Sequence, residues 1–398
     1  MIIRRKIEQN IRDTLNRGKS VILIGPRQTG KSTLVEHFIK PDISYTFAKE
    51  QTRQRYEQNP ALLEAELEEQ VKAYNKPPLV YIDEVQKIPR VMDIAQVLID
   101  NKQAHFILTG SSTRKLKHGT NLNLLPGRAV ALIMTPLLYE ELPEPKPSLE
   151  EILIYGTLPG ILLEKNLEAR EIDLYSYVTT YLEEEIRAEA LVRNVGSFSR
   201  FLELAAGESA RQLNFTRLAQ DIGIGDTTIA NYYQILEDCM ITRIVNPITK
   251  AETKRRLIKS PKHLFFDLGV RRACANEGIK LPKRLMAHLF EHYVGNELYN
   301  VSQLTSPHIK IKYWRDTAGT EVDYVLDIAQ HYIPIEVKSS DAPQAKDAKN
   351  LHRFISEYSQ ADHGYVICRT PHRYKISDNV TAIPWIEIAT LVKTEGRL

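Results

Sequence analysis

Cysteine is scarce in this 398-residue sequence, and the three present, Cys239, Cys274 and Cys368, lie far apart. An odd number of widely spaced thiols excludes a disulfide framework or a clustered zinc site and fits a reducing compartment. Long hydrophobic runs are also lacking, because no stretch approaches the ~18 apolar residues that cross a bilayer. The first ten residues lack the apolar core of a signal peptide. We therefore expect a soluble, cytoplasmic protein without membrane contact.

A strong charge of either sign is missing as well. The 53 basic and 50 acidic residues leave a formal net charge of +3, so any binding of nucleic acid must come from local basic patches. At roughly 150 residues per domain, the length predicts two to three domains. No internal repeat or low-complexity tract interrupts them.

What the sequence does contain is a phosphate-binding loop after an apolar run. Gly25-Pro-Arg-Gln-Thr-Gly-Lys-Ser32 has the spacing G-x-x-x-x-G-K-[ST] and follows the apolar residues 21–24. In this pattern backbone N–H groups cradle phosphates, Lys31 reaches the β/γ-phosphates and the Ser32 hydroxyl holds Mg²⁺. The sequence therefore predicts ATP and Mg²⁺ as ligands. The loop residues expected to contact nucleotide are Gly25, Pro26, Arg27, Gln28, Thr29, Gly30, Lys31, Ser32 and Thr33.

A second apolar run, residues 79–82, ends in two carboxylates. Asp83 is expected to complete the Mg²⁺ shell, and Glu84 is placed to polarise the attacking water as a base. A third run, residues 105–109, ends in hydroxyl residues. Thr109 or Ser111 is expected to touch the γ-phosphate or its water, with ordinary strand-end turn chemistry as the alternative.

An arginine stands just before the last apolar run of this region. Arg128 precedes residues 129–134, and we expect it to project toward the γ-phosphate bound by a neighbouring subunit. A guanidinium there stabilises the charge of the transition state. The alternative is a solvated turn arginine.

Apolar, strand-like runs alternate with helical patterns through the first third of the chain, at residues 21–24, 43–47, 79–82, 105–109 and 129–134. This alternation predicts a parallel sheet covered by helices on both faces. A proline-dense segment, residues 135–147, then predicts a boundary. We expect a multidomain α/β protein with an ATPase domain over 1–145, a helical connector over 146–208, a winged-helix domain over 209–280 and an α/β domain over 281–398.

Residues 212–247 have a helix-turn-helix pattern. A short helix over 214–222 and a second over 227–239 are expected, with Asp226 as the second N-cap. Thr228, Asn231 and Tyr232 are expected to face outward. The basic segment 250–263 is expected to act as a wing that clamps phosphates. Because the second helix has no arginine or lysine before Cys239, DNA contact through the backbone is favoured over base reading, and a structural role is the alternative.

The last third carries a second carboxylate pattern. Glu336 and Lys338 are two apart on one expected strand, so their side chains share a sheet face, and Asp323 lies on the neighbouring strand. Two hard carboxylates bind Mg²⁺, which activates water. A helix carboxylate, Glu291 or alternatively Glu297, is expected to complete this metal shell. A simple ion pair on a surface strand is the alternative.

A late helix over residues 344–358 carries basic side chains. Lys346, Lys349 and Arg353 fit either a face that tracks phosphates or an ordinary solvated face.

The order of the first motifs resembles the AAA+ ATPases: phosphate loop, Asp-Glu strand, Thr-Gly-Ser-Ser strand and Gly-Arg before the last strand. Residues 25–33 and 107–112 and Gly156-Thr-Leu-Pro159 are similar to a large prokaryotic group fused to a poorly characterised C-terminal region. Gly160 departs from that group, in which an acidic residue is expected. The resemblance implies a homo-oligomer such as a hexameric ring, although no clear second arginine sensor is present.

Asp323, Glu336 and Lys338 resemble, in order and strand context, the motif of the PD-(D/E)XK nuclease superfamily. This resemblance implies a restriction-endonuclease-like α/β domain, with the three residues as catalytic groups if the centre is active and with a nucleic-acid clamp if it is not.

These expectations combine into an ATP-hydrolysing protein that binds DNA mainly through its backbone and couples nucleotide turnover to DNA remodelling, with or without metal-dependent cleavage. The alternative is a nucleotide-gated signalling or assembly switch whose C-terminal domain docks a protein partner.

Overall fold

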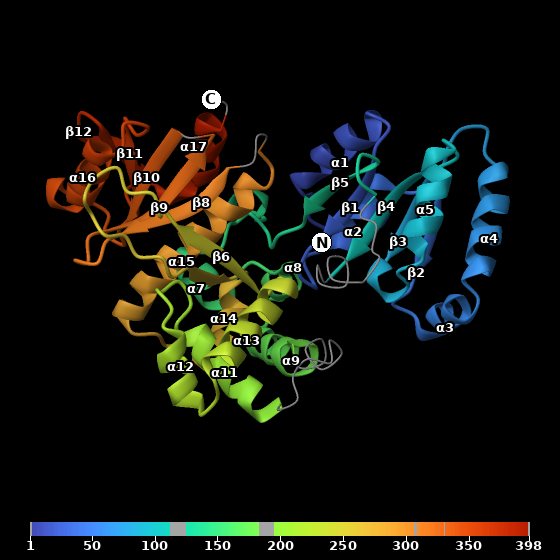
Figure 1. Cartoon of the computed structure of the whole chain (residues 1–398), viewed down its shortest axis with the longest axis horizontal. Helices are drawn as coiled ribbons and strands as arrows, with labels where there is room; N and C mark the ends of the chain where they lie inside the picture. Colours follow the sequence, from blue (N-terminus) through green and yellow to red (C-terminus); the bar gives the residue numbers. More distant parts are fainter. Residues whose placement is uncertain (1, 112–124, 183–194, 306–308, 330, 397–398) are drawn as a thin grey trace. The chain divides into compact units, whose positions relative to one another are not determined.

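The computed structural model describes residues 2–111, 125–182, 195–305, 309–329 and 331–396. The chain divides into two compact units, one of Met1–Leu137 with Asp238–Met240 and one of Leu138–Glu237 with Ile241–Leu398 (Figure 1). The three cysteines are buried and free, as expected. Among the described helices, none is both long enough and apolar enough to cross a bilayer.

Five parallel strands form the sheet of the first unit, at the five apolar runs that the sequence predicts. They are β1 (Ser20–Ile24), β2 (Ile43–Thr46), β3 (Leu79–Asp83), β4 (His105–Gly110) and β5 (Ala129–Ile133). The strand order is β2-β3-β4-β1-β5. The register pairs Ile24 with Gly110 and Ile82 with Leu108. The carboxyl ends of β1, β3 and β4 therefore lie side by side along one edge of the sheet. Ligands of open parallel sheets bind beyond this edge.

Helices of the first unit pack on this sheet. They are α1 (Ile7–Asn16), α2 (Lys31–Leu34) with its π-helical continuation η1 (Val35–Ile39), α3 (Glu50–Gln58), α4 (Pro60–Lys72), the 3₁₀ turn η2 (Val85–Lys87) and α5 (Val91–Asp100). Leu67 of α4 and Met92 of α5 share a core with Leu108 of β4. Because helices cover the sheet, its strands are nearly continuous apolar runs.

The second unit is built on an eight-stranded mixed sheet. Its strands are β6 (Thr242–Pro247), β7 (Lys262–Phe265), β8 (Lys310–Arg315), β9 (Glu321–Ile328), β10 (His331–Val337), β11 (Gly364–Cys368), β12 (Tyr374–Ser377) and β13 (Val380–Pro384). Their order is β12-β13-β11-β10-β9-β8-β6-β7. Strands β8, β9 and β10 are antiparallel neighbours, whereas β10, β11 and β13 run parallel.

Helices complete the second unit. They are the 3₁₀ turn η3 (Tyr139–Glu141), α7 (Leu149–Tyr155), α8 (Pro159–Leu163), α9 (Leu167–Ser176), the π-helix η4 (Tyr177–Leu182), α11 (Val195–Gly207), α12 (Phe215–Ile222), α13 (Asp226–Asp238), α14 (Leu268–Cys274), α15 (Lys283–Ser302), the 3₁₀ turn η5 (Ala345–Ala348), α16 (Lys349–Glu357), the 3₁₀ turn η6 (Trp385–Glu387) and α17 (Ile388–Glu395). Phe354 of α16 packs with Trp314 of β8 and Val366 of β11 in one core cluster. Helix α15 contacts α17, β8 and β10.

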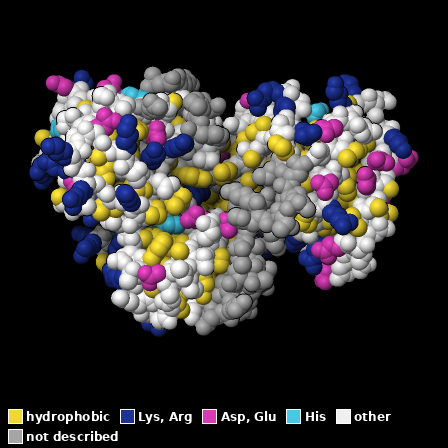
Figure 2. Space-filling model, in the orientation of Figure 1, with side chains coloured by type: hydrophobic (Ala, Val, Ile, Leu, Met, Phe, Trp, Pro, Cys, Tyr) yellow, Lys and Arg dark blue, Asp and Glu magenta, His cyan; other side chains and the backbone are white. Residues whose placement is uncertain are grey.

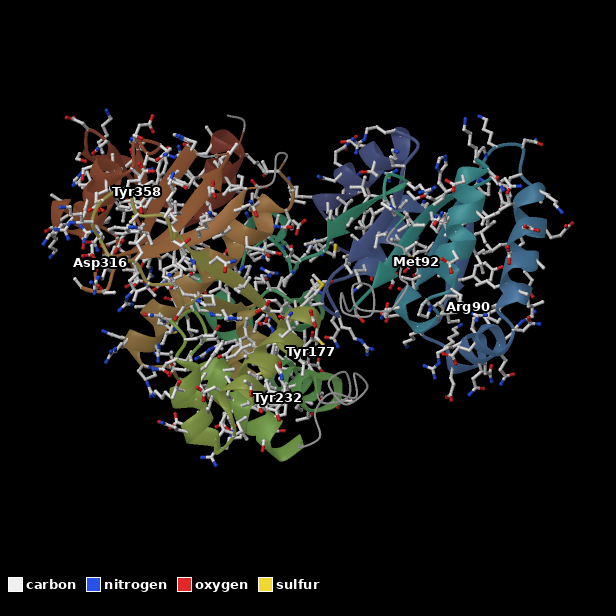
Figure 3. The ribbon with its side chains drawn as sticks, in the orientation of Figure 1. Arg90, Met92, Tyr177, Tyr232, Asp316 and Tyr358 are labelled. Atoms are coloured by element: carbon white, nitrogen blue, oxygen red, sulfur yellow. The ribbon has the colours of Figure 1, made fainter. Side chains whose placement is uncertain are left out.

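The helix-turn-helix forms at α12 and α13, with two corrections. Asp226 is the first residue of α13 and not its N-cap, and its carboxylate accepts a hydrogen bond from the Thr216 hydroxyl (2.9 Å). Tyr232 does not face outward: its ring is buried 5.0 Å from that of Phe198 and 5.2 Å from that of Phe201 (Figure 3). Both phenylalanines lie on α11, so α13 has a second buried face that its own sequence does not reveal.

The expected wing is also different. Strands β6 and β7 pair antiparallel after α13, but β6 pairs in parallel with β8 as well. The pair is therefore the edge of the eight-stranded sheet and not a separate wing. Assignment of this sheet to the nuclease-like fold remains a prediction.

Candidate nucleotide site and carboxylate centre

The phosphate loop joins β1 to α2 at the carboxyl edge of the first sheet. Gln28 and Gly30 have φ values of 59° and 92°, and left-handed residues of this kind let backbone N–H groups form a concave anion site. A Cβ atom on Gly25 would come within 2.2 Å of the Met134 carbonyl oxygen, so only glycine fits there. Around the loop, Arg27 is half-buried and Thr33 is exposed.

Lys31 is buried, and its ammonium is directed onto the loop. Its Nζ donates hydrogen bonds to the carbonyl oxygens of Gly25 (2.8 Å) and Pro26 (3.0 Å). The Thr29 hydroxyl also donates to the Pro26 carbonyl (2.8 Å). The lysine therefore lies among the backbone groups that the sequence assigns to phosphate binding.

Asp83 at the end of β3 gathers three hydroxyl groups from different segments. Its carboxylate accepts a hydrogen bond from Thr109 of β4 at 2.6 Å, from Ser32 of α2 at 3.3 Å and from Thr46 of β2 at 3.4 Å. Hydroxyl and carboxylate oxygens are the hard ligands that Mg²⁺ takes. Ser32 and Asp83 therefore fit a Mg²⁺ ion.

Glu84 follows Asp83 and is held by two neighbouring side chains. Its Oε2 accepts hydrogen bonds from Gln86 Nε2 (2.5 Å) and Ser111 Oγ (3.3 Å), and Gln86 also donates to Ser111 (3.2 Å). The sequence indicates Ser111 but not Gln86. No signal in the sequence singles out Gln86, because it stands beside Lys87 between Val85 and Ile88.

Arg128 lies at the amino ends of the strands, opposite the phosphate loop. It immediately precedes β5, whose first residue pairs with Ser20 at the start of β1, and strands of this length span about 16 Å. Its guanidinium donates two hydrogen bonds to the Asp100 carboxylate (2.5 and 2.9 Å). Arg128 therefore does not serve the site of its own subunit, and its role toward a neighbour stays a prediction. Ser112, which completes the hydroxyl motif, lies outside the described residues.

In the second unit, Asp323, Glu336 and Lys338 come together as predicted. Lys338 Nζ donates to Glu336 Oε1 (2.7 Å), and Asp323 Oδ2 accepts from the Val337 N–H (2.8 Å). Burial raises the pKa of Glu336 to about 8, with a contribution from the nearby Asp323. Burial also raises the pKa of Asp323 to about 7, with a contribution from Glu291.

Asp323 and Glu336 form a carboxylate centre together with Glu291 of α15 and Glu321 of β9. A buried lysine, Lys262, lies among these four carboxylates. Lys262 Nζ lies 3.4 Å from Glu291 Oε1 and 2.6 Å from Glu321 Oε1. The alternative ligand Glu297 points elsewhere, since its carboxylate accepts the Tyr139 N–H (2.9 Å). Within the described ranges, no three His, Cys, Asp or Glu side chains form a group that could hold a metal ion. Lys262 already pairs with Glu291 and Glu321, and Lys338 pairs with Glu336. Because these ammonium groups neutralise the carboxylates, the centre does not fit the Mg²⁺ ion that the nuclease resemblance implies.

The Gly156-Thr-Leu-Pro159 motif lies against a buried aspartate. The Thr157 N–H donates to Asp267 Oδ2 (2.7 Å), and Asp267 also caps α14 through the Val270 N–H (3.0 Å). Gly156 has φ 72°, and a Cβ atom there would lie 2.1 Å from Asp267 Oδ1. The motif thus fixes the turn after α7 to the start of α14.

The basic segment 250–263 is only partly available to a ligand. Arg255 binds Glu357 of α16 (3.0 Å) and Asp316, while its neighbours Lys254, Arg256 and Lys259 are exposed. The basic residues of the late helix are exposed as well: Lys346, Lys349 and Arg353. Figure 2 shows Lys and Arg side chains over the part of the second unit that carries α16.

Three family models match successive parts of the chain. Residues 17–143 match the AAA domain, residues 146–280 a domain of unknown function (DUF8612) and residues 286–388 a second domain of unknown function (DUF4143).

Two relatives span nearly the whole chain. An uncharacterized protein of Mycobacterium tuberculosis is 24% identical over 392 residues, which cover 98% of this chain and 85% of the relative. An uncharacterized protein of Methanocaldococcus jannaschii is 21% identical over 438 residues, which cover 96% and 87%.

Among solved structures, the chain is similar to the Orc1 protein of Aeropyrum pernix in complex with DNA (12% identity, 69% of this chain and 93% of that chain, TM-score 0.27). It is also similar to a signal-transduction ATPase with numerous domains from Pyrococcus horikoshii (13% identity, 76% and 47%, TM-score 0.27). The phosphate loop and the family matches together show that this chain joins an AAA-type P-loop ATPase domain to two domains of unknown function.

Proposed function

We propose that the first unit hydrolyses ATP and that the second unit binds DNA, so that nucleotide turnover drives DNA remodelling. The observation that carries the hydrolysis step is the arrangement around β3. Asp83 binds the hydroxyl of Ser32, and Glu84 is held by Gln86 and Ser111 on the same edge of the sheet. These are the metal-binding and water-positioning roles that phosphoryl transfer requires.

The residues act in distinct ways. The Lys31 ammonium exchanges the carbonyl oxygens of Gly25 and Pro26 for phosphate oxygens when ATP enters the loop. Ser32 and Asp83 would hold Mg²⁺, which neutralises phosphate charge when bound. The Glu84 carboxylate accepts a hydrogen bond from the attacking water and orients this water toward the γ-phosphate.

Loss of the Lys31 charge tests this part of the proposal. Lys31→Ala should lower ATP turnover by at least about 100-fold, because a preorganised charge at the phosphates is lost. Lys72→Ala, on the exposed side of α4, should leave turnover unchanged. Equal turnover in wild type and Lys31→Ala would contradict hydrolysis at this loop.

DNA binding is supported by exposed basic residues of the second unit. Lys349 and Arg353 lie on α16, and Lys254 and Arg256 lie on the segment that Arg255 ties to α16 through Glu357. Scattered lysines and arginines of this kind neutralise backbone phosphates without reading sequence. The proposal does not extend to DNA cleavage, because the carboxylate centre does not fit Mg²⁺.

Salt dependence tests the DNA-binding surface. Lys349→Glu with Arg353→Glu should weaken binding of duplex and single-stranded DNA and lower the log–log salt slope by about 1 for each phosphate that is no longer neutralised. Binding is measured by fluorescence anisotropy, with Arg53→Glu/Lys72→Glu in the first unit as the charge-matched control. The same slope in both double variants would exclude this surface.

A nucleotide-gated assembly switch is the second candidate. It is supported by a pocket of about 420 Å³ in the second unit, because apolar side chains form much of its lining. The pocket is lined by Leu149, Glu150, Leu153, Lys283, Met286, Ala287, Phe290, Ser339 and Arg369. A wild-type protein without DNA affinity, whose oligomerisation is lost in Lys31→Ala, would support this function over DNA remodelling.

A further inference from the structure

The sequence places Lys262 in a basic segment expected to bind phosphates, but the structure buries its side chain. It belongs to the most basic segment of the chain, yet it is 2% exposed. Its Nζ approaches Glu321 of β9 and Glu291 of α15. The ring centroids of Tyr313 and Tyr324 lie 5.0 and 5.9 Å from the same nitrogen. An ammonium is buried in this way only where opposite charge surrounds it.

We infer that the Lys262 ammonium is the resident cation of the carboxylate centre and takes the place of a divalent metal ion. The carboxylate centre is therefore a set of ion pairs that joins β7, β9 and α15 without a metal ion. This inference does not depend on ATP hydrolysis or on DNA binding.

The backbone fixes Lys262 in this position. In the β6–β7 ladder Lys262 pairs with Val245, and an isolated bridge joins it to Gln212 on its other side. The lysine is thus held between two backbone segments, and its side chain extends to β9 and α15. The pairing fixes the point from which the side chain of Lys262 extends to the carboxylates.

The other charged side chains of the carboxylate centre are also paired with groups of opposite charge. Lys338 is hydrogen-bonded to Glu336, and Arg315 donates to Glu321 Oε2 (2.7 Å). Asp323 feels the charges of both Lys262 and Lys338. A divalent ion placed among these carboxylates would lie close to two ammonium groups, which repel it, and would have to displace their hydrogen bonds.

Manganese binding by the full chain tests the inference. Asp83→Asn removes the carboxylate ligand proposed for the first unit and serves as the common background. Free Mn²⁺ is followed by electron paramagnetic resonance without nucleotide. Up to about 1 mM Mn²⁺, this protein and its Asp323→Asn derivative should bind equal amounts, because the lysine already neutralises the centre. A site with one Mn²⁺ per chain that disappears in Asp323→Asn would overturn the inference.

Removal of the ammonium gives the second arm. Lys262→Met in the same background should gain one Mn²⁺ site that Asp323→Asn abolishes again, whereas Lys259→Met, at an exposed lysine three positions earlier, should gain none. A folded Lys262→Met protein without that site would overturn the inference. If Lys262→Met fails to fold in a thermal melt, Lys262→Met/Glu321→Gln, which removes one charge of each sign, takes its place under the same criteria.

Discussion

At the residue scale, the orientation of Glu84 depends on two neutral donors. Gln86 and Ser111 both donate to its Oε2, and Gln86 is 6% exposed. A carboxylate held in this way keeps one oxygen occupied and leaves the other for water. In the proposed function, the two donors therefore act as positioning groups for hydrolysis.

Replacement of one donor should separate turnover from binding. Gln86→Leu keeps the size of the side chain but loses the amide, so Glu84 loses its shortest hydrogen bond. We expect kcat for ATP to fall about 10-fold, a part of the usual contribution of a general base, with little change in KM. Steady-state kinetics check this, with Gln54→Leu on the exposed side of α3 as control. An unchanged kcat would exclude a positioning role for Gln86.

Gly156 provides a second prediction at this scale. Gly156→Ala should lower the free energy of unfolding of the second unit by about 3 kcal/mol, because the new Cβ meets the Asp267 carboxylate and φ is positive. Gly160→Ala is the matched control, since a Cβ there meets nothing within 4 Å. Urea unfolding that shows equal losses in both variants would refute this explanation of the motif.

At the scale of elements, α15 carries two histidines that burial keeps neutral. His288 Nε2 lies 2.8 Å from the Ser209 carbonyl oxygen, and His292 Nε2 lies 3.0 Å from that of Phe265. Burial lowers the pKa of His288 to about 4 and that of His292 well below its ordinary value. The unfolded chain therefore binds these protons more readily than the folded protein between pH 6.5 and about 4.

The stability of the second unit should follow from this difference. The histidine contribution is fully present above pH 6.5 and is lost as the pH falls toward 4, by at most about 1.4 kcal/mol per pH unit and group. The raised pKa of Asp267, about 6, acts in the opposite direction, because its protonation stabilises the fold. Comparison with a variant is therefore needed to isolate the histidines.

Thermal unfolding between pH 4 and 7 makes that comparison. His288→Gln keeps a donor for the Ser209 carbonyl but cannot be protonated, so its melting temperature should fall less steeply with acid than that of wild type. His372→Gln, at an exposed histidine, should follow wild type. Parallel curves for wild type and His288→Gln would contradict the role of this histidine.

Elements were predictable from sequence where the signal is local. The five strands of the first unit are short apolar runs between helical patterns, and the structure confirms all five. The prediction that Tyr232 faces outward is wrong, because its burial depends on Phe198 and Phe201, which lie on another helix. A single helical pattern shows one buried face and cannot show that a second helix covers the other.

The residues of the candidate sites were predictable where a local motif marks them and not where their partners lie far away in the sequence. Lys31, Ser32 and Asp83 carry motif signals, and the structure brings the last two within hydrogen-bonding distance. Arg255 and Lys262 resemble a free basic wing in sequence because their acidic partners come much later in the chain. Glu357, for example, lies 102 residues after Arg255.

At the scale of the whole molecule, the two units carry different chemistry. The first carries the phosphate loop and the proposed hydrolysis site, whereas the second has a carboxylate centre that we infer is neutralised by its own lysines. In the proposed function, energy is released in the first unit, and the second unit provides a binding surface. That function therefore depends on ATP turnover at Glu84.

Measurement of ATP binding and ATP turnover in Glu84→Gln is the most direct test of that dependence. Glutamine keeps the shape of the side chain and its contacts to Gln86 and Ser111 but cannot act as a base. We predict ATP affinity close to that of wild type and turnover lower by at least about 100-fold. Turnover at the wild-type rate in Glu84→Gln would contradict the proposed hydrolysis site.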